Sequence, residues 1–148
     1  MFSRTAEYAL RSMACLARHG TRRVSTFELA SQAAVPANYL AKVLQLLANA
    51  SLISGRRGIG GGYQLARDPA QISLLDILRA VNDIDGSESE PDKPYTRDPM
   101  LVALHRIMDD ATAVMKHSLR SVTLAQIVAQ SEPSSTGTAE GTARQAVS

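Results

Sequence analysis

The amino-acid sequence predicts a mainly α-helical protein with one small β-hairpin, arranged as a winged helix-turn-helix followed by a long C-terminal dimerisation helix. Three observations support this prediction. The N-terminal half holds short amphipathic segments with helix-capping signals, an arginine- and glycine-rich segment joins two strand-like runs within 52–66, and an apolar repeat runs through 100–122. The 148 residues are enough to bury one core without cross-links.

The first two helices are predicted over 2–18 and 24–34. Apolar residues recur at helical spacing in the first, and Gly20 then supplies a stop signal. Ser25 and Glu28 have the spacing of a capping box at the start of the second. The residues expected on the apolar face of this second helix are Phe27, Leu29 and Ala30.

The third helix, predicted over 37–49, has two contrasting faces. Its apolar stripe consists of Leu40, Val43, Leu44 and Leu47. Its opposite face contains no acidic residue and consists of Asn38, Ala41, Lys42, Gln45 and Asn49. Because Val35-Pro36 interrupts the chain just before it, the two helices predict a helix-turn-helix whose second member is the recognition helix.

The most informative segment is the hairpin tip, residues 55–62, which holds two arginines and five glycines. It joins strand-like runs at 52–54 and 63–66. Glycine permits positive φ and close backbone approach, and arginine fits phosphates and narrow grooves. The segment therefore predicts a wing that lies against nucleic acid. A fourth helix, capped by Ser73, should follow it. The residues expected to be buried there are Leu74, Ile77, Leu78 and Val81.

The second half of the chain changes character. We predict a winged helix-turn-helix DNA-binding domain over 1–83, an acidic loop over 84–99, a dimerisation helix with a short terminal helix over 100–130, and a disordered tail over 131–148. The residues of the predicted helical seam are Leu101, Leu104, Met108, Ala111 and Met115. Their spacing of close to 3.5 residues suits the same helix of a second copy, and packing on the chain's own domain is the alternative.

Charge is unevenly distributed although the net charge is only +2. Residues 1–67 hold nine basic and two acidic side chains, a net +7, and residues 68–148 hold seven basic and twelve acidic ones, a net −5. This asymmetry favours a polyanion-binding N-terminal half over chance clustering of solvated charges.

Several classes of protein are not expected. The single cysteine, Cys15, permits no intramolecular disulfide and is expected to be a buried, inert thiol rather than a redox sensor. The chain shows no signal peptide or membrane-length apolar run, so a cytoplasmic location without a membrane partner is expected. It also has no metal-ligand spacing and no nucleophile elbow, so an enzyme is not expected.

The candidate DNA-binding residues come from three places. Arg57 is the leading candidate, because Arg56 precedes it and glycines follow it. Tyr39 is either a phosphate hydrogen-bond partner or a residue at the edge of the core. The full set is Arg56, Arg57, Gly58, Gly60 and Gly61 of the tip, Asn38, Tyr39, Lys42 and Gln45 of the recognition helix, and the helix start at Thr26.

Four segments resemble the bacterial winged-helix regulator family that includes IscR, NsrR and CymR. They are Glu7-Tyr8-Ala9-Leu10, residues 38–44, residues 57–63 and Val122-Thr123-Leu124, and the similarity covers about residues 1–130. The resemblance implies a homodimer that reads a roughly palindromic operator. It also implies a recognition helix in the major groove, with Asn38, Tyr39, Lys42 and Gln45 facing that groove or its phosphates, and a wing that places Arg57 in the adjacent minor groove.

The sequence departs from the family at one point. Members that hold an iron–sulfur cluster have three cysteines in the loop before the long helix, and residues 84–100 here contain none. His105 and Glu7 fall where relatives supply other ligands, but these two side chains cannot hold a cluster alone. We therefore expect no cofactor.

The sequence thus predicts a sequence-specific DNA-binding transcriptional regulator, with repression as the expected effect. Its partners should be double-stranded DNA and a second copy of the chain. The alternative is a winged-helix interaction module that acts mainly through a protein partner such as a metabolic enzyme. The sequence does not decide which signal controls the regulator. A small molecule, a partner enzyme, oxidation of Cys15 and the absence of any ligand stay as alternatives.

Overall fold

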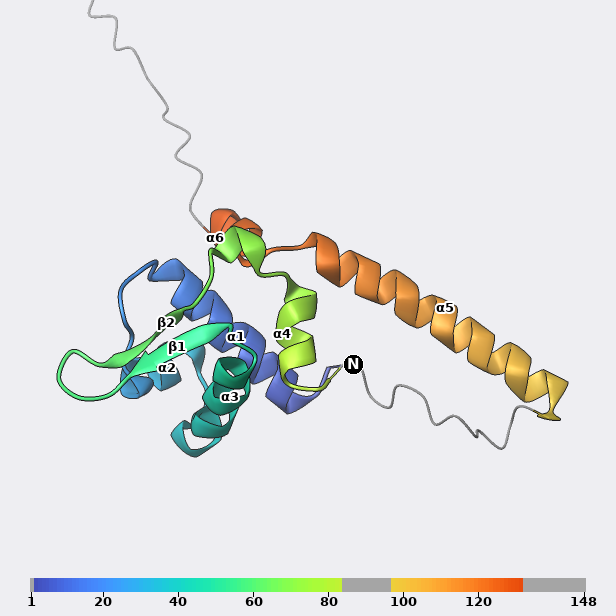
Figure 1. Ribbon diagram of the computed structural model, residues 1–148, viewed down its shortest axis with the longest axis horizontal. Helices are drawn as coiled ribbons and strands as arrows, with labels where there is room; N and C mark the ends of the chain where they lie inside the picture. The colour runs from blue at the N-terminus through green and yellow to red at the C-terminus, as the bar shows by residue number, and fades with distance from the viewer. Residues whose placement is uncertain (1, 84–96, 132–148) are drawn as a thin grey trace, which may run out of the picture.

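A helical body carries a hairpin on one side and a long projecting helix on the other (Figure 1). The computed structural model describes residues 2–83 and 97–131. The elements are α1 (Arg4–Arg18), α2 (Thr26–Ala33), α3 (Ala37–Asn49), β1 (Ile53–Arg56), β2 (Gly62–Leu65), the 3-10 turn η1 (Pro69–Gln71), α4 (Leu74–Ala80), α5 (Pro99–Ser121) and α6 (Leu124–Ser131). The predicted class, mainly α with one small hairpin, is confirmed.

Helix α1 is the centre of the body. It contacts α2, α3, α4, α6 and β2, and Figure 1 shows it in the middle of the body between α6 and α3. Its buried face is built from small and medium side chains, among them Ala6, Ala9, Met13 and Leu16, all at most 1% exposed. Because alanines let neighbouring helices approach closely, one short helix can serve as the core of the whole body.

The helix-turn-helix forms as expected, with two local differences. The apolar stripe of α3, which includes Leu40 and Leu44, is at most 1% exposed. Ala34 ends α2 in the left-handed conformation, with φ of 52°. Phe27 was expected on the apolar face but is 87% exposed. The prediction was wrong because Leu29 and Ala33 form the buried stripe of α2, and a residue two positions before Leu29 points to the opposite side.

The wing is hydrogen-bonded on both sides of β2. Strands β1 and β2 pair antiparallel from Ile53–Leu65 to Arg56–Gly62. On the other side of β2, the amide N–H groups of Val24 and Tyr63 each donate to the other's carbonyl oxygen at 2.8 Å. This exchange attaches the hairpin to Val24, the residue before the N-cap of α2. The backbone of the wing is therefore fixed relative to the helix-turn-helix.

The C-terminal part returns to the body through a short backbone bridge. Ser73 caps α4 in a capping box with Asp76, which confirms the predicted cap. The Leu74 amide donates to the Val122 carbonyl at 2.9 Å, and the Leu124 amide donates to the Ile72 carbonyl at 3.0 Å. Leu124 itself is fully buried, so α6 completes the core.

Helix α5 stands away from this body. None of its residues is buried. The acidic loop predicted over 84–99 lies outside the described residues except for its last three positions, and the tail predicted over 131–148 lies outside them beyond Ser131. None of the helices in the described part is long and apolar enough to cross a membrane.

Gly62 is the glycine that the wing anchor requires most. Its φ is +134°, and a Cβ placed on it would lie 2.5 Å from the Val24 carbonyl oxygen. We expect Gly62→Ala to lower the free energy of unfolding by more than about 2 kcal/mol. Gly60 is the matched control, because its φ is +72° and its surroundings are open. Gly60→Ala should cost about 1 kcal/mol, and equal costs in urea denaturation would contradict the anchor.

Candidate nucleic-acid interface

Helix α3 presents a continuous polar face to solvent. Asn38, Ala41, Lys42, Gln45 and Asn49, the residues predicted for its outer face, are all exposed. Their side chains offer hydrogen-bond donors and acceptors, one methyl group and one positive charge, and they are held by a helix whose opposite side is buried. This combination suits direct recognition of base edges.

Tyr39 is held by α1 rather than presented to solvent. Its hydroxyl lies 2.7 Å from the Thr5 hydroxyl, and its ring meets the ring of Tyr8 edge to face at 5.3 Å between centroids. The ammonium of Lys42 lies 6.0 Å from the centroid of the Tyr39 ring. Of the two roles left open by the sequence, these contacts favour the position at the edge of the core. A direct phosphate contact by Tyr39 stays a prediction.

The hairpin tip has glycines where its own backbone needs them. The Gly61 amide donates to the Gly58 carbonyl at 3.0 Å, and Gly58 and Gly60 have φ of +92° and +72°. A Cβ on Gly61 would lie 2.4 Å from the Arg56 carbonyl oxygen. The sequence suggested that these glycines serve close approach to DNA. The turn itself accounts for all three glycines, Gly61 by lack of space and Gly58 and Gly60 by their positive φ. The surroundings of Gly58 and Gly60 are open and also leave room for a ligand.

A cleft separates the hairpin tip from the start of α2. Its volume is about 510 Å³. The residues lining it are Ser25, Thr26, Ala48, Gly55, Arg56, Arg57, Gly58, Gly61, Gly62 and Tyr63. The cleft thus brings together the amino end of α2, the exposed carboxyl end of α3 and both arginines of the tip. The side chains of Arg56 and Arg57 are exposed and make no ion pair within residues 2–83 and 97–131.

The two acids of residues 1–67 do not neutralise this cleft. Glu7 pairs with Arg11 within α1. Glu28 pairs with Arg22 at 2.7 Å, and the hydrogen bond from Arg22 holds the pKa of the Glu28 carboxyl below its ordinary value. The Glu28 carboxylate accepts hydrogen bonds from Arg22 and does not complete the predicted capping box. The Ser25 hydroxyl alone caps α2, by accepting from the Glu28 amide. The positive charge of Lys42, Arg56 and Arg57 therefore remains available to a polyanion.

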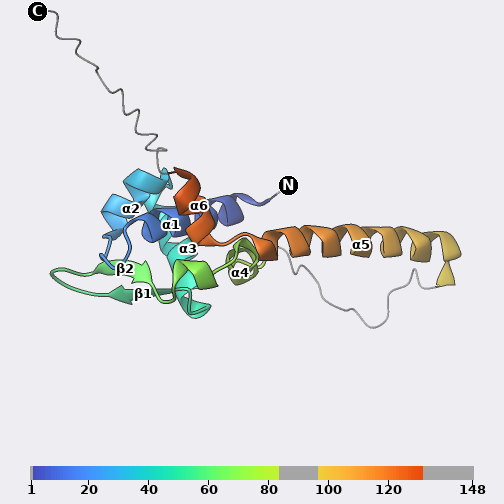
Figure 2. The ribbon, with the colours of Figure 1, turned by 90° about the horizontal axis from the view of Figure 1, so that it is seen from above.

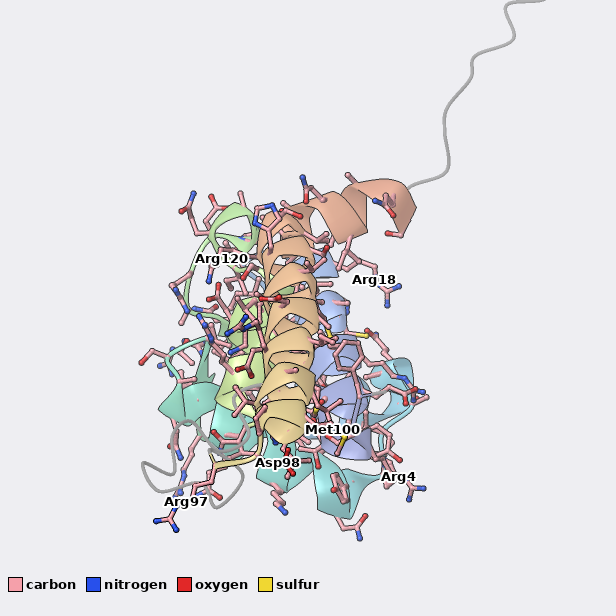
Figure 3. The ribbon with its side chains drawn as sticks, turned by 90° about the vertical axis from the view of Figure 1, so that its right-hand side faces the viewer. Arg4, Arg18, Arg97, Asp98, Met100 and Arg120 are labelled. Atoms are coloured by element: carbon pink, nitrogen blue, oxygen red, sulfur yellow. The ribbon has the colours of Figure 1, made fainter. Side chains whose placement is uncertain are left out.

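The predicted seam residues lie on an exposed apolar face of α5. Leu104, Met108 and Met115 are 50%, 52% and 41% exposed, Ala111 is also exposed, and Leu101 is half-buried. Sequence reasoning missed Ile107 and Val114, which are 66% and 68% exposed. Their spacing of seven, in register with Met100, was the signal that would have found them. Figure 3 looks at the free end of α5, where Met100 lies, with Arg120 at the end that rejoins the body.

The residues present do not fit an iron–sulfur cluster. Cys15, the only cysteine of the chain, is buried in α1. Within the described residues, no group of three or more His, Cys, Asp and Glu side chains could hold a metal ion. Glu7 is engaged with Arg11, so the two predicted vestigial positions, Glu7 and His105, supply no thiolate and no complete ligand set.

The environment of Cys15 disfavours its thiolate form. Burial raises the pKa of this thiol, and the nearby charge of Arg18 only partly opposes the effect. Because a raised pKa leaves less thiolate at a given pH, we expect Ellman's reagent at pH 8 to react at least about tenfold more slowly with the folded chain than with the chain in denaturant. Equal rates would show an accessible thiol and reopen the redox alternative.

Comparison with known proteins places this geometry in a family. Residues 2–130 match the Rrf2 family, which is described as an iron-dependent transcriptional regulator. BadM of Rhodopseudomonas palustris, an HTH-type transcriptional regulator by name, is 35% identical over 115 residues, which cover 76% of this chain and 71% of BadM. Rv1287 of Mycobacterium tuberculosis, likewise named an HTH-type transcriptional regulator, is 33% identical over 135 residues, covering 88% of this chain and 83% of that protein.

Solved structures agree with the sequence relatives. IscR of T. potens is similar with a TM-score of 0.72 at 27% identity, over 89% of this chain and 88% of that one. CymR, the global cysteine regulator of B. subtilis, is similar with a TM-score of 0.70 at 27% identity, over 89% of this chain and 98% of that one. The chain therefore belongs to the Rrf2 family of transcriptional regulators, as a member whose single cysteine cannot supply a set of cluster ligands.

Proposed function

We propose that the protein is a sequence-specific DNA-binding repressor that acts as a homodimer on a palindromic operator, without an iron–sulfur cluster of its own. The observation that carries this proposal is the cleft of about 510 Å³ between the amino end of α2, the end of α3 and the arginine-bearing tip. A recognition helix and a wing on two sides of one cleft suit a duplex whose strand passes between them.

In this proposal the cleft holds the DNA backbone that separates a major groove from the adjacent minor groove. The first amides of α2, at Thr26 and Phe27, point toward the amino end of the helix, where a phosphate is favourable. Arg56 and Arg57 add two mobile positive charges from the opposite wall. Because neutralised phosphates release counterions, binding should weaken steeply as salt rises.

Base recognition is assigned to the exposed face of α3. Asn38 and Gln45 carry amides that can pair with adenine, Lys42 can donate to guanine or to a phosphate, and the methyl of Ala41 can meet thymine. Each good pair of this kind contributes about 1–3 kcal/mol of discrimination. Tyr39 is assigned a supporting role, because Thr5 and Tyr8 already hold it.

Dimerisation is assigned to the apolar face of α5, formed by Met100, Leu104, Ile107, Met108, Ala111, Val114 and Met115. Helix α5 has 23 residues and no buried side chain, and it packs on the body through α4 and the half-buried Leu119, so its exposed apolar face gains little stability from that body. Pairing of two such faces would remove the exposed methionines and branched side chains from water. We accordingly propose α5 as the dimerisation part and residues 1–83 as the DNA-binding domain, whose core α6 completes through Leu124.

Arg57→Ala tests the wing. We expect roughly tenfold weaker binding to a selected operator at fixed salt, a salt slope reduced by about 1, and a blunted preference for A·T-rich flanks. The control is Arg67→Ala, which removes another exposed arginine, beyond the far end of β2. Fluorescence anisotropy over a salt series measures all three quantities. An unchanged slope and preference for Arg57→Ala would remove Arg57 from the interface.

Two alanines on opposite sides of α5 test the dimer. Ala111 lies within the apolar face, and Ala113 lies about 200° around the helix from it, and both are exposed. We expect Ala111→Glu to give a monomer in sedimentation velocity, because two buried carboxylates would face each other. Ala113→Glu should leave the dimer intact. A dimer that survives Ala111→Glu would rule out this face as the interface.

A further inference from the structure

We propose that Ile59 is an apolar DNA-contact residue, which the hairpin tip buries against the deoxyribose walls of the minor groove. This inference rests on the proposed function, since it needs the wing to enter that groove. It differs from the role of Arg57, because the contribution of Ile59 comes from removal of apolar surface from water rather than from charge.

Ile59 is the most exposed large hydrophobic residue in the described part of the chain. Its relative exposure is 106%, against 87% for Phe27 and 71% for Met100. Met100 belongs to the apolar face of α5, which a second copy would cover. Nothing comparable surrounds Ile59, because the rest of the tip consists of glycine and arginine.

The turn that carries Ile59 does not itself call for isoleucine. Gly58 to Gly61 form a β-turn closed by the bond from the Gly61 amide to the Gly58 carbonyl, and the φ of +72° at Gly60 is that of the third position of a type II turn. Ile59 holds the second position, where proline is favoured and a β-branched side chain has no advantage. A residue that local structure does not require, at the tip of a basic hairpin, points to a role in binding.

The tip presents this side chain in a fixed place. A Cβ on Gly61 would lie 2.4 and 2.7 Å from the carbonyl oxygens of Arg56 and Gly58, so the two sides of the turn are closely packed. At its base, Tyr63 exchanges two 2.8 Å hydrogen bonds with Val24. A side chain held on such a turn loses little backbone freedom when it binds, so its burial contributes most of its free energy to affinity.

The surroundings of Ile59 select the minor groove over an apolar protein surface. The hairpin lies on the side of the body away from α5, so a dimer formed through α5 leaves the tip uncovered (Figures 1 and 2). Two exposed arginines, Arg56 and Arg57, precede Ile59 by three and two positions in the chain. The minor groove matches both side-chain types, since its walls are the C–H surfaces of sugars and its potential attracts arginine.

The test compares Ile59→Ala and Ile59→Leu with the wild type on an operator selected with the wild-type protein. Because Ile59 is exposed, neither variant should change the melting temperature. We expect Ile59→Ala to weaken binding roughly tenfold, as loss of three partly buried carbons implies. The salt slope should stay unchanged, since no charge is lost. Ile59→Leu should bind within about threefold of wild type.

Hydroxyl-radical footprinting gives the position, because the radical attacks deoxyribose from the minor groove. Wild type and Ile59→Leu should protect sugars at the flanks of the site. Ile59→Ala should lose the protection at the flanks and keep the rest of the footprint. If wild type binds and Ile59→Ala matches it in affinity and footprint, the role of Ile59 is refuted and the regulator remains. If the wild type itself binds no duplex, the proposed function fails first, and this inference fails with it.

Discussion

The arrangement of the interface depends on one backbone exchange, the pair of 2.8 Å hydrogen bonds between Val24 and Tyr63. A two-stranded hairpin is marginally stable alone. Here β2 gains a second neighbour, Val24, which directly precedes Ser25, the N-cap of α2. The position of the hairpin relative to the helix-turn-helix is thereby set by backbone bonds as well as by the packing of Ile53, Tyr63 and Leu65 on the core. Gly62 is the residue that permits this approach, since any Cβ there would overlap the Val24 carbonyl.

The rest of the body supports that geometry from α1. The small side chains of α1 let α2, α3, α4 and α6 pack around one helix, and its polar edge holds the recognition helix through the Thr5–Tyr39 hydrogen bond. The Arg11 guanidinium also donates to the Ala34 carbonyl at the turn between α2 and α3. Helix α5 has no buried residue and reaches this core only through the half-buried Leu119, so the proposed dimerisation face stands apart from the proposed DNA-binding face.

Sequence periodicity and caps predicted the helices well, because those signals act within a few residues. The serine caps at Ser25 and Ser73 and the apolar stripe of α3 are local and were found. Phe27 was misplaced because a short helix offers two plausible apolar faces, and only tertiary packing chooses between them. The Tyr39–Thr5 bond joins residues 34 positions apart, so no local pattern indicates it. The proposed partner of α5 is a second copy of the chain, and a pattern within one chain leaves that partner open.

The most direct measurement of the central claim is binding of the purified protein to random duplex fragments, followed by sequencing of the bound fraction. If helix and wing occupy neighbouring grooves from a two-fold dimer, the bound fragments share an inverted repeat with half-sites one helical turn or a multiple apart. The logarithm of the binding constant should also fall linearly with the logarithm of the salt concentration. Failure to retain any duplex at very low ionic strength would contradict the account.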